Sequence, residues 1–441
     1  MKTREKTQSF DPLTSGHSPK IIGSSQRDPL LLSFIAGTIF MVFAPIEAQT
    51  QSPQDYTPMD PIPQIVDLPD PCDNPTTRMW GPDDRLGNLN YLTPERVSEN
   101  LSLIRLGRVY ELAHTLVPGQ MGFNAYFDFK TTLGPWPGRG TALTIFNNEE
   151  TLGHSTYNRD RAGVQQTSLG TQLDAFNHTT QGGITYNCFD TRDPAYHLLP
   201  EGDPGDLPKG NSGDDYFFRG YSTGGIENLG TIVARAVLID VGELLREREA
   251  AAGREPEQFP PADYEFSPEE LEQALIRQGM TIDDIQPGDA ILIRIGWGAR
   301  YWTSNPDDPR NEIVKYFNGG QEEFRPNGPG IDSRAVQWTI NRRPVLVGAD
   351  NTSVESSPLG LRGSEKRGHL AWLSSGIYMI EDLDLEVLAA DCETERAANM
   401  AEFGEPLPPD DEANCYVSTL IVQTNPFRGF TGSIVAPSTI R

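Results

Sequence analysis

The amino-acid sequence predicts a domain of mixed α/β or α+β class built on a central sheet. Two continuous apolar runs rich in β-branched residues, Thr231 to Val241 and Ala290 to Ile295, have the composition of buried strands. Helix starts are signalled at Thr93-Pro94 and at Ser267-Pro268, where a capping residue precedes proline at the first helical position. Helices and strands therefore alternate along the chain.

Each expected element follows from such a local signal. A Ser-Pro-Glu-Glu capping box predicts a helix from Ser267 to about Gly279, and alternation of apolar and polar residues predicts a strand over 108–116. The remaining expected elements are a helix from Pro94 to about Arg105, helices over 334–341 and 368–374, and strands over 231–241, 290–295, 344–347, 377–380 and 416–422.

The N-terminal region is expected to be a signal peptide over residues 1–48. Leu30 to Ala44 form an uncharged apolar run that follows several basic residues and precedes small residues, with Ala48 as the expected last residue removed. The run is shorter than the ~20 residues of a membrane span. An uncleaved membrane anchor is the alternative. A proline-rich linker over 49–75 leads into a domain over 76–441, because such a segment cannot bury enough apolar surface to fold.

The formal net charge of −26 argues against a nucleic-acid partner and, after cleavage, against an anionic membrane surface. Four cysteines permit two disulfides in three pairings, and Cys392 with Cys415 is the pair we favour; free thiols remain an alternative. Three polar stretches rich in glycine, proline and acidic residues are interpreted as long loop insertions: Pro200 to Gly220, Glu247 to Asp263, and Trp302 to Pro329.

The segment from Ser168 to His178 contains the residues best suited to chemistry. A Gly170-Thr171 turn is followed by Asp174, a carboxylate that can bind a metal, and then by His178, which can transfer protons near neutral pH. His369 and Glu381 lie far downstream. We therefore expect a site assembled from two distant segments.

This segment resembles the HxGTHxDxPxH signature of the cyclase family of metal-dependent hydrolases, which includes kynurenine formamidase and isatin hydrolase. Ser168, Gln172 and Phe176 stand where the family has histidine, histidine and proline. Further resemblance lies in four places: 80–90, 288–297, 348–351 with Glu355, and His369 with Glu381. The resemblance implies a swivelling β/β/α fold with a central sheet and a homodimer or higher homo-oligomer.

The resemblance also implies the roles of the site residues. One family metal position would have Ser168, Gln172 and Asp174, which are weak ligands as a set, and the other would have Asp174, His369 and Glu381. We therefore expect one divalent ion, zinc or manganese, with Gln172 adding a carbonyl oxygen or holding the bound water. His178 would act as general base or acid. The expected activity is hydrolysis of a small cyclic or aryl amide, imide or lactone.

Other residues leave alternatives open. Ser168, Trp80 and Phe123 are candidates for substrate binding, although aromatic residues more often pack in cores. Ser168 could instead be the nucleophile of a metal-free serine hydrolase with His178 and Asp174. The Gly220-x-Ser222-x-Gly224 match fits a loop better than a nucleophile elbow. A third alternative is a non-catalytic protein that binds a small molecule.

Overall fold

The computed structural model describes most of the chain from residue 79 onward. The described residues are 72, 79–115, 146–147, 155–159, 161–162, 165–166, 170–181, 183–190, 193, 221–255, 260–261, 264–298, 329–351, 353–356, 368–408, 414–427 and 429–441. The expected signal peptide, Ser168 and Phe123 lie outside these ranges, as does all but Cys72 of the expected linker. All described residues belong to one unit of the chain, residues 59–441.

The described helices and strands are those of a mixed α/β fold. The α-helices are α2 (Pro94–Leu101), α3 (Val241–Ala251), α4 (Pro268–Arg277), α7 (Ser333–Asn341), α9 (Gly368–Ser374) and α10 (Glu386–Phe403). The main sheet contains β1 (Val109–Glu111), β6 (Gln172–Asp174), β10 (Thr231–Asp240), β12 (Ala290–Arg294), β14 (Leu346–Ala349), β15 (Tyr378–Glu381), β16 (Val417–Gln423), β17 (Gly432–Ile434) and β18 (Ser438–Ile440). Short 3-10 helices include η2 (Phe176–His178), η3 (Tyr186–Cys188) and η6 (Ile226–Asn228).

The main sheet is nine-stranded, in the order β1-β18-β16-β10-β12-β14-β15-β6-β17. Its centre, β10-β12-β14-β15, is parallel, and the strands on either side are antiparallel. All five residues of β12 and all four residues of β14 are buried, as expected for strands covered on both faces. Smaller sheets accompany it; in one of them β7 (Thr179–Gln181) pairs with β3 (Ser155–Arg159).

The main sheet curls so that its two ends approach each other. Strands β17 and β18 are ninth and second in the order, which corresponds to roughly 34 Å across a flat sheet with strands about 4.8 Å apart. Only residues 435–437 connect them, and so short a connection spans at most about 15 Å. The segment after β1 closes the gap, because the Leu112 amide donates to Pro437 and the His114 amide donates to the Thr171 hydroxyl beside β6.

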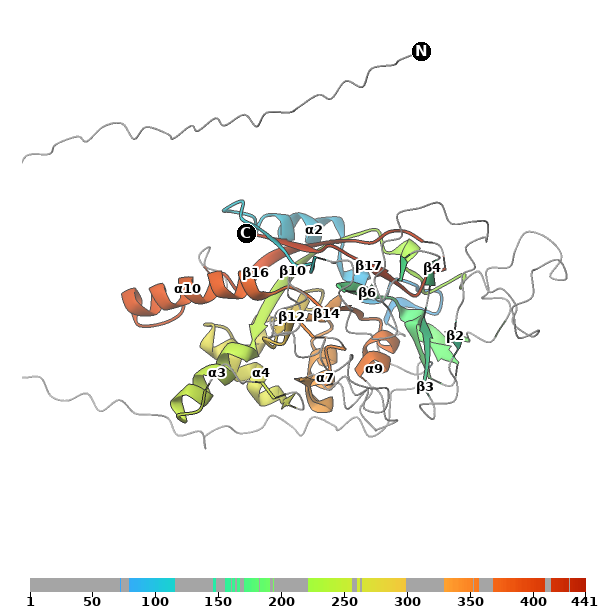
Figure 1. The fold of residues 1–441 in the computed structure, drawn as a ribbon. Helices are drawn as coiled ribbons and strands as arrows, with labels where there is room; N and C mark the ends of the chain where they lie inside the picture. Colours follow the sequence, from blue (N-terminus) through green and yellow to red (C-terminus); the bar gives the residue numbers. More distant parts are fainter. Residues whose placement is uncertain are drawn as a thin grey trace, which may run out of the picture. The chain divides into compact units, whose positions relative to one another are not determined.

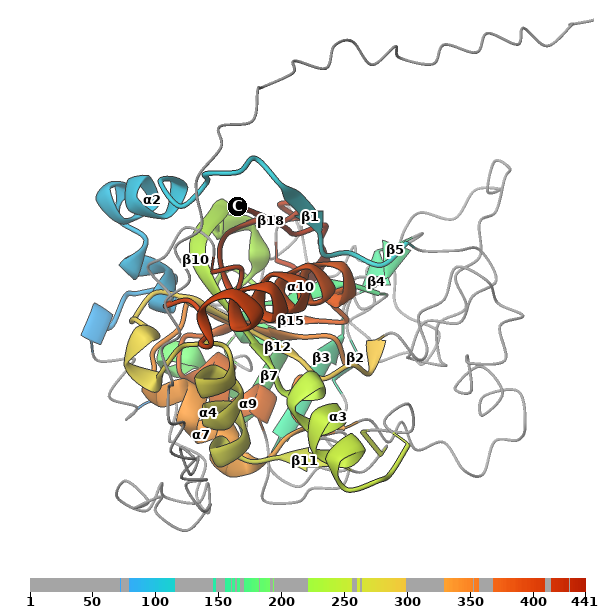
Figure 2. The ribbon, with the colours of Figure 1, turned by 90° about the vertical axis from the view of Figure 1, so that its left-hand side faces the viewer.

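The helices cover the sheet and define where the site lies. Figure 1 shows α3, α4, α7 and α9 in a row along one side of the sheet, with α2 on the other. In Figure 2, α10 crosses in front of the strands. Helix α9 packs against α7, β15, β7 and η2. All seven of its residues are buried, so this short helix is held by packing on every side.

The sequence predicts many of these elements but misses helices α3 and α10 and strands β6, β17 and β18, and it places β14 two residues too early. Helix α9 has its predicted bounds, and β10, β12, α4, α7, β15 and β16 differ from prediction by a residue or two at an end. Helix α2 ends at Leu101, and β1 is limited to three residues. The supposed insertion from Glu247 begins inside α3, and polar residues after Cys392 belong to α10. Pro200 to Gly220 lies outside the described residues, as does Trp302 to Pro329 except for Pro329.

Both disulfides are formed, Cys72–Cys188 and Cys392–Cys415. The second is the pair favoured from the sequence, and it joins α10 to the residues just before β16. The first ties residue 72 to η3, which follows the signature segment. No helix in the described ranges combines the length and apolar character that a membrane crossing requires.

Replacing both Cys392 and Cys415 with alanine should lower the free energy of unfolding by about 3 kcal/mol, because the bridge closes a loop between residues separated by 23 positions. The measurement is urea denaturation of wild type and double variant, with mass spectrometry verifying that Cys72–Cys188 remains. Equal midpoints and slopes would show that this bridge adds no stability.

Candidate metal centre

Strand β6 places two polar side chains of the signature segment inside the sheet. It lies between β15 and β17, with Gln172 opposite Glu381 and Asp174 opposite Met379. Because side chains of alternate residues point to the same face, Gln172, Asp174 and Glu381 share one face of the sheet. All three are almost fully buried. The preceding Gly170 has φ of 72°, a conformation that favours glycine.

The 3-10 helix η2 turns the chain after β6 and returns a histidine toward the aspartate. The His178 amide donates to the Ala175 carbonyl, which closes this turn. Nε2 of His178 then lies 3.7 Å from Oδ2 of Asp174. The loop at Thr223-Gly224 supports the turn, because it accepts hydrogen bonds from the side chain and the amide of Asn177.

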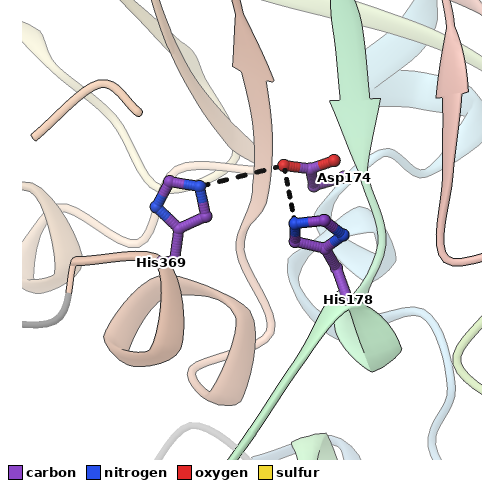
Figure 3. Close-up of side chains that lie close together, drawn as sticks. All are labelled: Asp174, His178 and His369. Carbon is purple, nitrogen blue, oxygen red and sulfur yellow. Dashed lines mark ion pairs between the residues drawn. The ribbon is translucent and has the colours of Figure 1, made fainter. Parts of the chain in front are cut away.

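Helix α9 brings the second segment to the same place. His369, its second residue, directs Nε2 toward Asp174 Oδ2 at 4.0 Å (Figure 3). Asp174 lies between the rings of His178 and His369, whose centroids are 6.1 Å apart (Figure 3). Residues separated by almost two hundred positions in the sequence are thus neighbours in the fold.

Glu381 and Gln172 complete this side of the site. Nε2 of His369 lies 2.7 Å from Oε1 of Glu381. The amide nitrogen of Gln172 donates to the other oxygen of Glu381 at 2.7 Å. Within the described part of the chain, the buried Oε1 of Gln172 has no hydrogen-bond partner. Gln172 therefore holds Glu381 in place and keeps one acceptor oxygen available.

Glu355 contacts His369 from the other side. Its Oε1 lies 2.8 Å from Nδ1 of His369 and accepts from the backbone amide of the same residue. The sequence marked Glu355 only as part of a family resemblance and gave it no role. We call Asp174, His178, Glu355, His369 and Glu381 the acid–histidine cluster.

The cluster concentrates negative charge where water is scarce. Asp174, Glu355 and Glu381 are at most 4% exposed, and their described ion pairs are with the two histidines. Burial alone would lower the pKa of His369, but the charges and hydrogen bonds of Glu355 and Glu381 outweigh it and hold this pKa well above its usual value. Three buried carboxylates and two imidazoles would be further stabilised by a cation.

The donor atoms fit a divalent metal ion. One ligand atom each from Asp174, His178 and His369 lie within 4.8 Å of one another. Two ligands on one zinc ion are roughly 3.4 Å apart for bonds of about 2.0–2.1 Å, so the spacings of 3.7 and 4.0 Å are compatible with a shared ion. Imidazole and carboxylate groups are suitable donors for zinc and manganese.

The structure places the other candidates less decisively. Trp80 packs edge-on against Tyr91, with ring centroids 4.9 Å apart, and has no described contact with the acid–histidine cluster. Its substrate role stays a prediction, as do those of Ser168 and Phe123 outside the described residues. Ser222 precedes the three-residue helix η6 rather than an α-helix, as expected for a loop.

His114 and Asp350 lie close together beside Gly298, and Asp350 directly follows the carboxyl end of β14. Both lie close to Gly298, which leaves little space for a side chain there. Burial lowers the pKa of His114 to about 4, although a backbone hydrogen bond to Leu383 and the charge of Glu386 oppose it. Burial and the charge of Glu386 raise the pKa of Asp350 to about 7. The charge of Arg294 and the hydrogen bonds from the amides of Ile295 and Gly296 act in the opposite direction, because they lower it.

Comparison with known proteins identifies the family. Residues 109–356, more than half of the 441, match the Cyclase family. The chain therefore belongs to the cyclase family. His369 and Glu381 lie beyond the matched residues, so their place beside Asp174 rests on the structure.

A solved structure of a cyclase shows the same fold, and isatin hydrolases are also among the similar structures. A crystal structure of a novel cyclase has a TM-score of 0.53 at 22% identity, covering 85% of this chain and 100% of its own. Isatin hydrolase A from Ralstonia solanacearum has a TM-score of 0.37 at 18% identity, covering 79% and 98%. Isatin hydrolase A from Labrenzia aggregata, bound to benzyl benzoate, has a TM-score of 0.37 at 16% identity, covering 80% and 98%. No curated protein matches the chain.

His114→Gln should reduce the loss of stability on acidification. The folded-state pKa of about 4 lies below the unfolded value of 6.5, so the unfolded chain takes up the proton first as pH falls. His114 therefore makes the free energy of unfolding fall by up to about 1.4 kcal/mol per pH unit between those values. Urea denaturation from pH 4 to 7 measures this slope.

As a control, Asp350→Asn should change the pH dependence of the free energy of unfolding in the opposite direction to His114→Gln. The folded-state pKa of Asp350, about 7, lies above the unfolded 3.8, so its contribution to stability is present at low pH and is lost as pH rises toward 7. Removing it should steepen the loss on acidification. If His114→Gln keeps the wild-type slope, His114 is not buried as a neutral ring.

Proposed function

We propose that this chain is a metal-dependent hydrolase that uses one divalent ion to hydrolyse a small cyclic or aryl amide, imide or lactone. The observation that carries the proposal is the convergence of Asp174, His369 and Glu381 from two distant segments, with His178 beside them. Membership of the cyclase family supports a hydrolase. The family resemblance of the signature segment supports the substrate class.

Asp174, His369 and Glu381 are the proposed ligands. Among the described residues, the set whose donor atoms all lie within 4.8 Å of one another is Asp174, His178 and His369, and in the first set His369 lies near both carboxylates. The first set is favoured because it leaves one imidazole free to transfer protons, which hydrolysis of an amide requires at the leaving nitrogen. A bound zinc or manganese ion would supply a Lewis acid and lower the pKa of water at the site.

A single ion is favoured because Gln172 stands at the position of a family histidine. Its amide nitrogen already donates to Glu381, and only its carbonyl oxygen remains for another role. An amide oxygen is a weaker ligand than imidazole for zinc. Gln172 therefore supports the ion held by Glu381 rather than binding a second one.

Side chains of the site would transfer the proton, orient the metal ligands and exclude water. Nε2 of His178 lies close enough to Oδ2 of Asp174 for a proton on the ring to be stabilised there and passed to a leaving nitrogen. Gln172 orients Glu381, and burial excludes bulk water, which strengthens every electrostatic interaction within the cluster.

We also propose that the protein is exported, with a signal peptide over residues 1–48. The two disulfides support this proposal, because such bridges persist in oxidising compartments. The expected partners are a small-molecule substrate and further copies of the chain.

Elemental analysis of the purified full chain should find about one zinc or manganese ion per chain. His369→Ala should lose the ion, because it removes the imidazole nearest to both Asp174 and Glu381. His114→Gln is the matched control, because His114 is outside the cluster and its side chain is 8% exposed, and it should keep the ion. Two ions per wild-type chain would contradict the account of Gln172, and no ion would contradict the proposed function.

His178→Asn should lower kcat by about 10² to 10⁴-fold on the amide or lactone that the wild type hydrolyses, since general acid–base catalysis contributes that much. The variant should retain about one ion per chain. Loss of the metal from this variant would instead make His178 the third ligand. Unchanged kcat would remove it from the mechanism.

A further inference from the structure

Glu355 is fully buried and is aimed at one residue. The same oxygen, Oε1, accepts from the His369 amide at 3.2 Å and lies 2.8 Å from Nδ1 of its ring. The opposite ring nitrogen, Nε2, faces Glu381 and Asp174. His369 is therefore held on both edges of its ring by carboxylates from different parts of the fold.

Two glycines lie against Glu355, one beside its carboxylate and the other beside its backbone. A Cβ added at Gly368 would lie 2.7 Å from Oε2 of Glu355, closer than side-chain atoms normally approach. A Cβ added at Gly330 would lie 2.3 Å from the backbone carbonyl carbon of Glu355. A larger residue at Gly368 would press on the Glu355 carboxylate and the Trp372 ring, and one at Gly330 would press on the backbone of Glu355 and Ser356.

The backbone before Glu355 is strained, which also indicates a fixed position. Ser353 and Val354 have φ of 96° and 61°, and a β-branched residue rarely adopts such a conformation. The turn is held by the Asn351 side chain, which donates to the Pro329 carbonyl at 2.7 Å, and by the Ile331 amide, which donates to the Val354 carbonyl. Asp382, directly after Glu381, also has positive φ, at 54°. Strain of this kind collects at functional sites and persists only where the surroundings enforce it.

From this geometry we infer that Glu355 is a positioning residue, which fixes the His369 ring with Nε2 turned toward Asp174 and Glu381. The inference rests on the proposed function, because the fixed nitrogen is the one that would bind the metal ion. A carboxylate on the far nitrogen of a metal-binding histidine sets the ring orientation and typically changes metal affinity 10–100-fold. Glu355 itself touches neither substrate nor metal in this account.

The test compares zinc binding by Glu355→Gln and Glu355→Ala with wild type, starting from metal-free full-length protein and using a competing chelator. Glutamine keeps the size and one acceptor oxygen, so affinity should fall about 10-fold; alanine removes both, so it should fall about 100-fold. Glu265→Gln is the matched control, since Glu265 accepts from the hydroxyl of neighbouring Ser356 and has no described contact with His369. It should bind zinc like wild type.

A second measurement does not need the metal. In metal-free protein, carbethoxylation of His369 by diethylpyrocarbonate, followed by mass spectrometry, should be faster in both Glu355 variants than in wild type and Glu265→Gln, because the ring is no longer held. Wild-type protein that binds no zinc would overturn the proposed function, while this reactivity would still test the role of Glu355. Equal affinity and equal reactivity in the folded Glu355→Gln and Glu355→Ala variants would overturn the inference.

Discussion

Strand β6 is held between β15 and β17 in one register, and the acid–histidine cluster depends on that register. A shift by one residue would turn Gln172 and Asp174 to the other face of the sheet. Asp174 would then no longer lie beside His178 and His369, and Gln172 would lose its hydrogen bond to Glu381. The curl of the sheet supports this pairing, because it closes the structure around β6 through Thr171 and the segment after β1.

The electrostatics of the cluster follow from its burial. Carboxylates that are withdrawn from water need polar or cationic partners, and the two histidines are the ion-pair partners described for them. His369 takes part in three of these four contacts. The same arrangement that raises its pKa would, with a metal ion bound, direct a neutral imidazole toward the ion. The cluster is thus ordered by its own charges before any ligand arrives.

Sequence reasoning found the strands and site residues that carry a local signal. The runs at β12 and in the second half of β10 could be identified because strands buried on both faces are continuously apolar. Helices α3 and α10 were missed because each buries only a few residues and its apolar residues do not gather in a clear stripe. Asp174, His178, His369 and Glu381 were found from their resemblance to a family pattern. The role of Glu355 could not be read, since it depends on two glycine contacts and a strained turn that exist only in three dimensions.

The hydrogen bond from Gln172 to Glu381 joins residues 209 positions apart. Contacts of such long range form late, because the entropy of closing the intervening chain must be overcome before they contribute. In a partly folded chain, the metal-binding side chains would be present but not yet assembled into the acid–histidine cluster. Assembly of the cluster is therefore a marker of complete folding. A metal ion that binds only the assembled cluster would shift the folding equilibrium toward the native state without taking part in the folding steps before it.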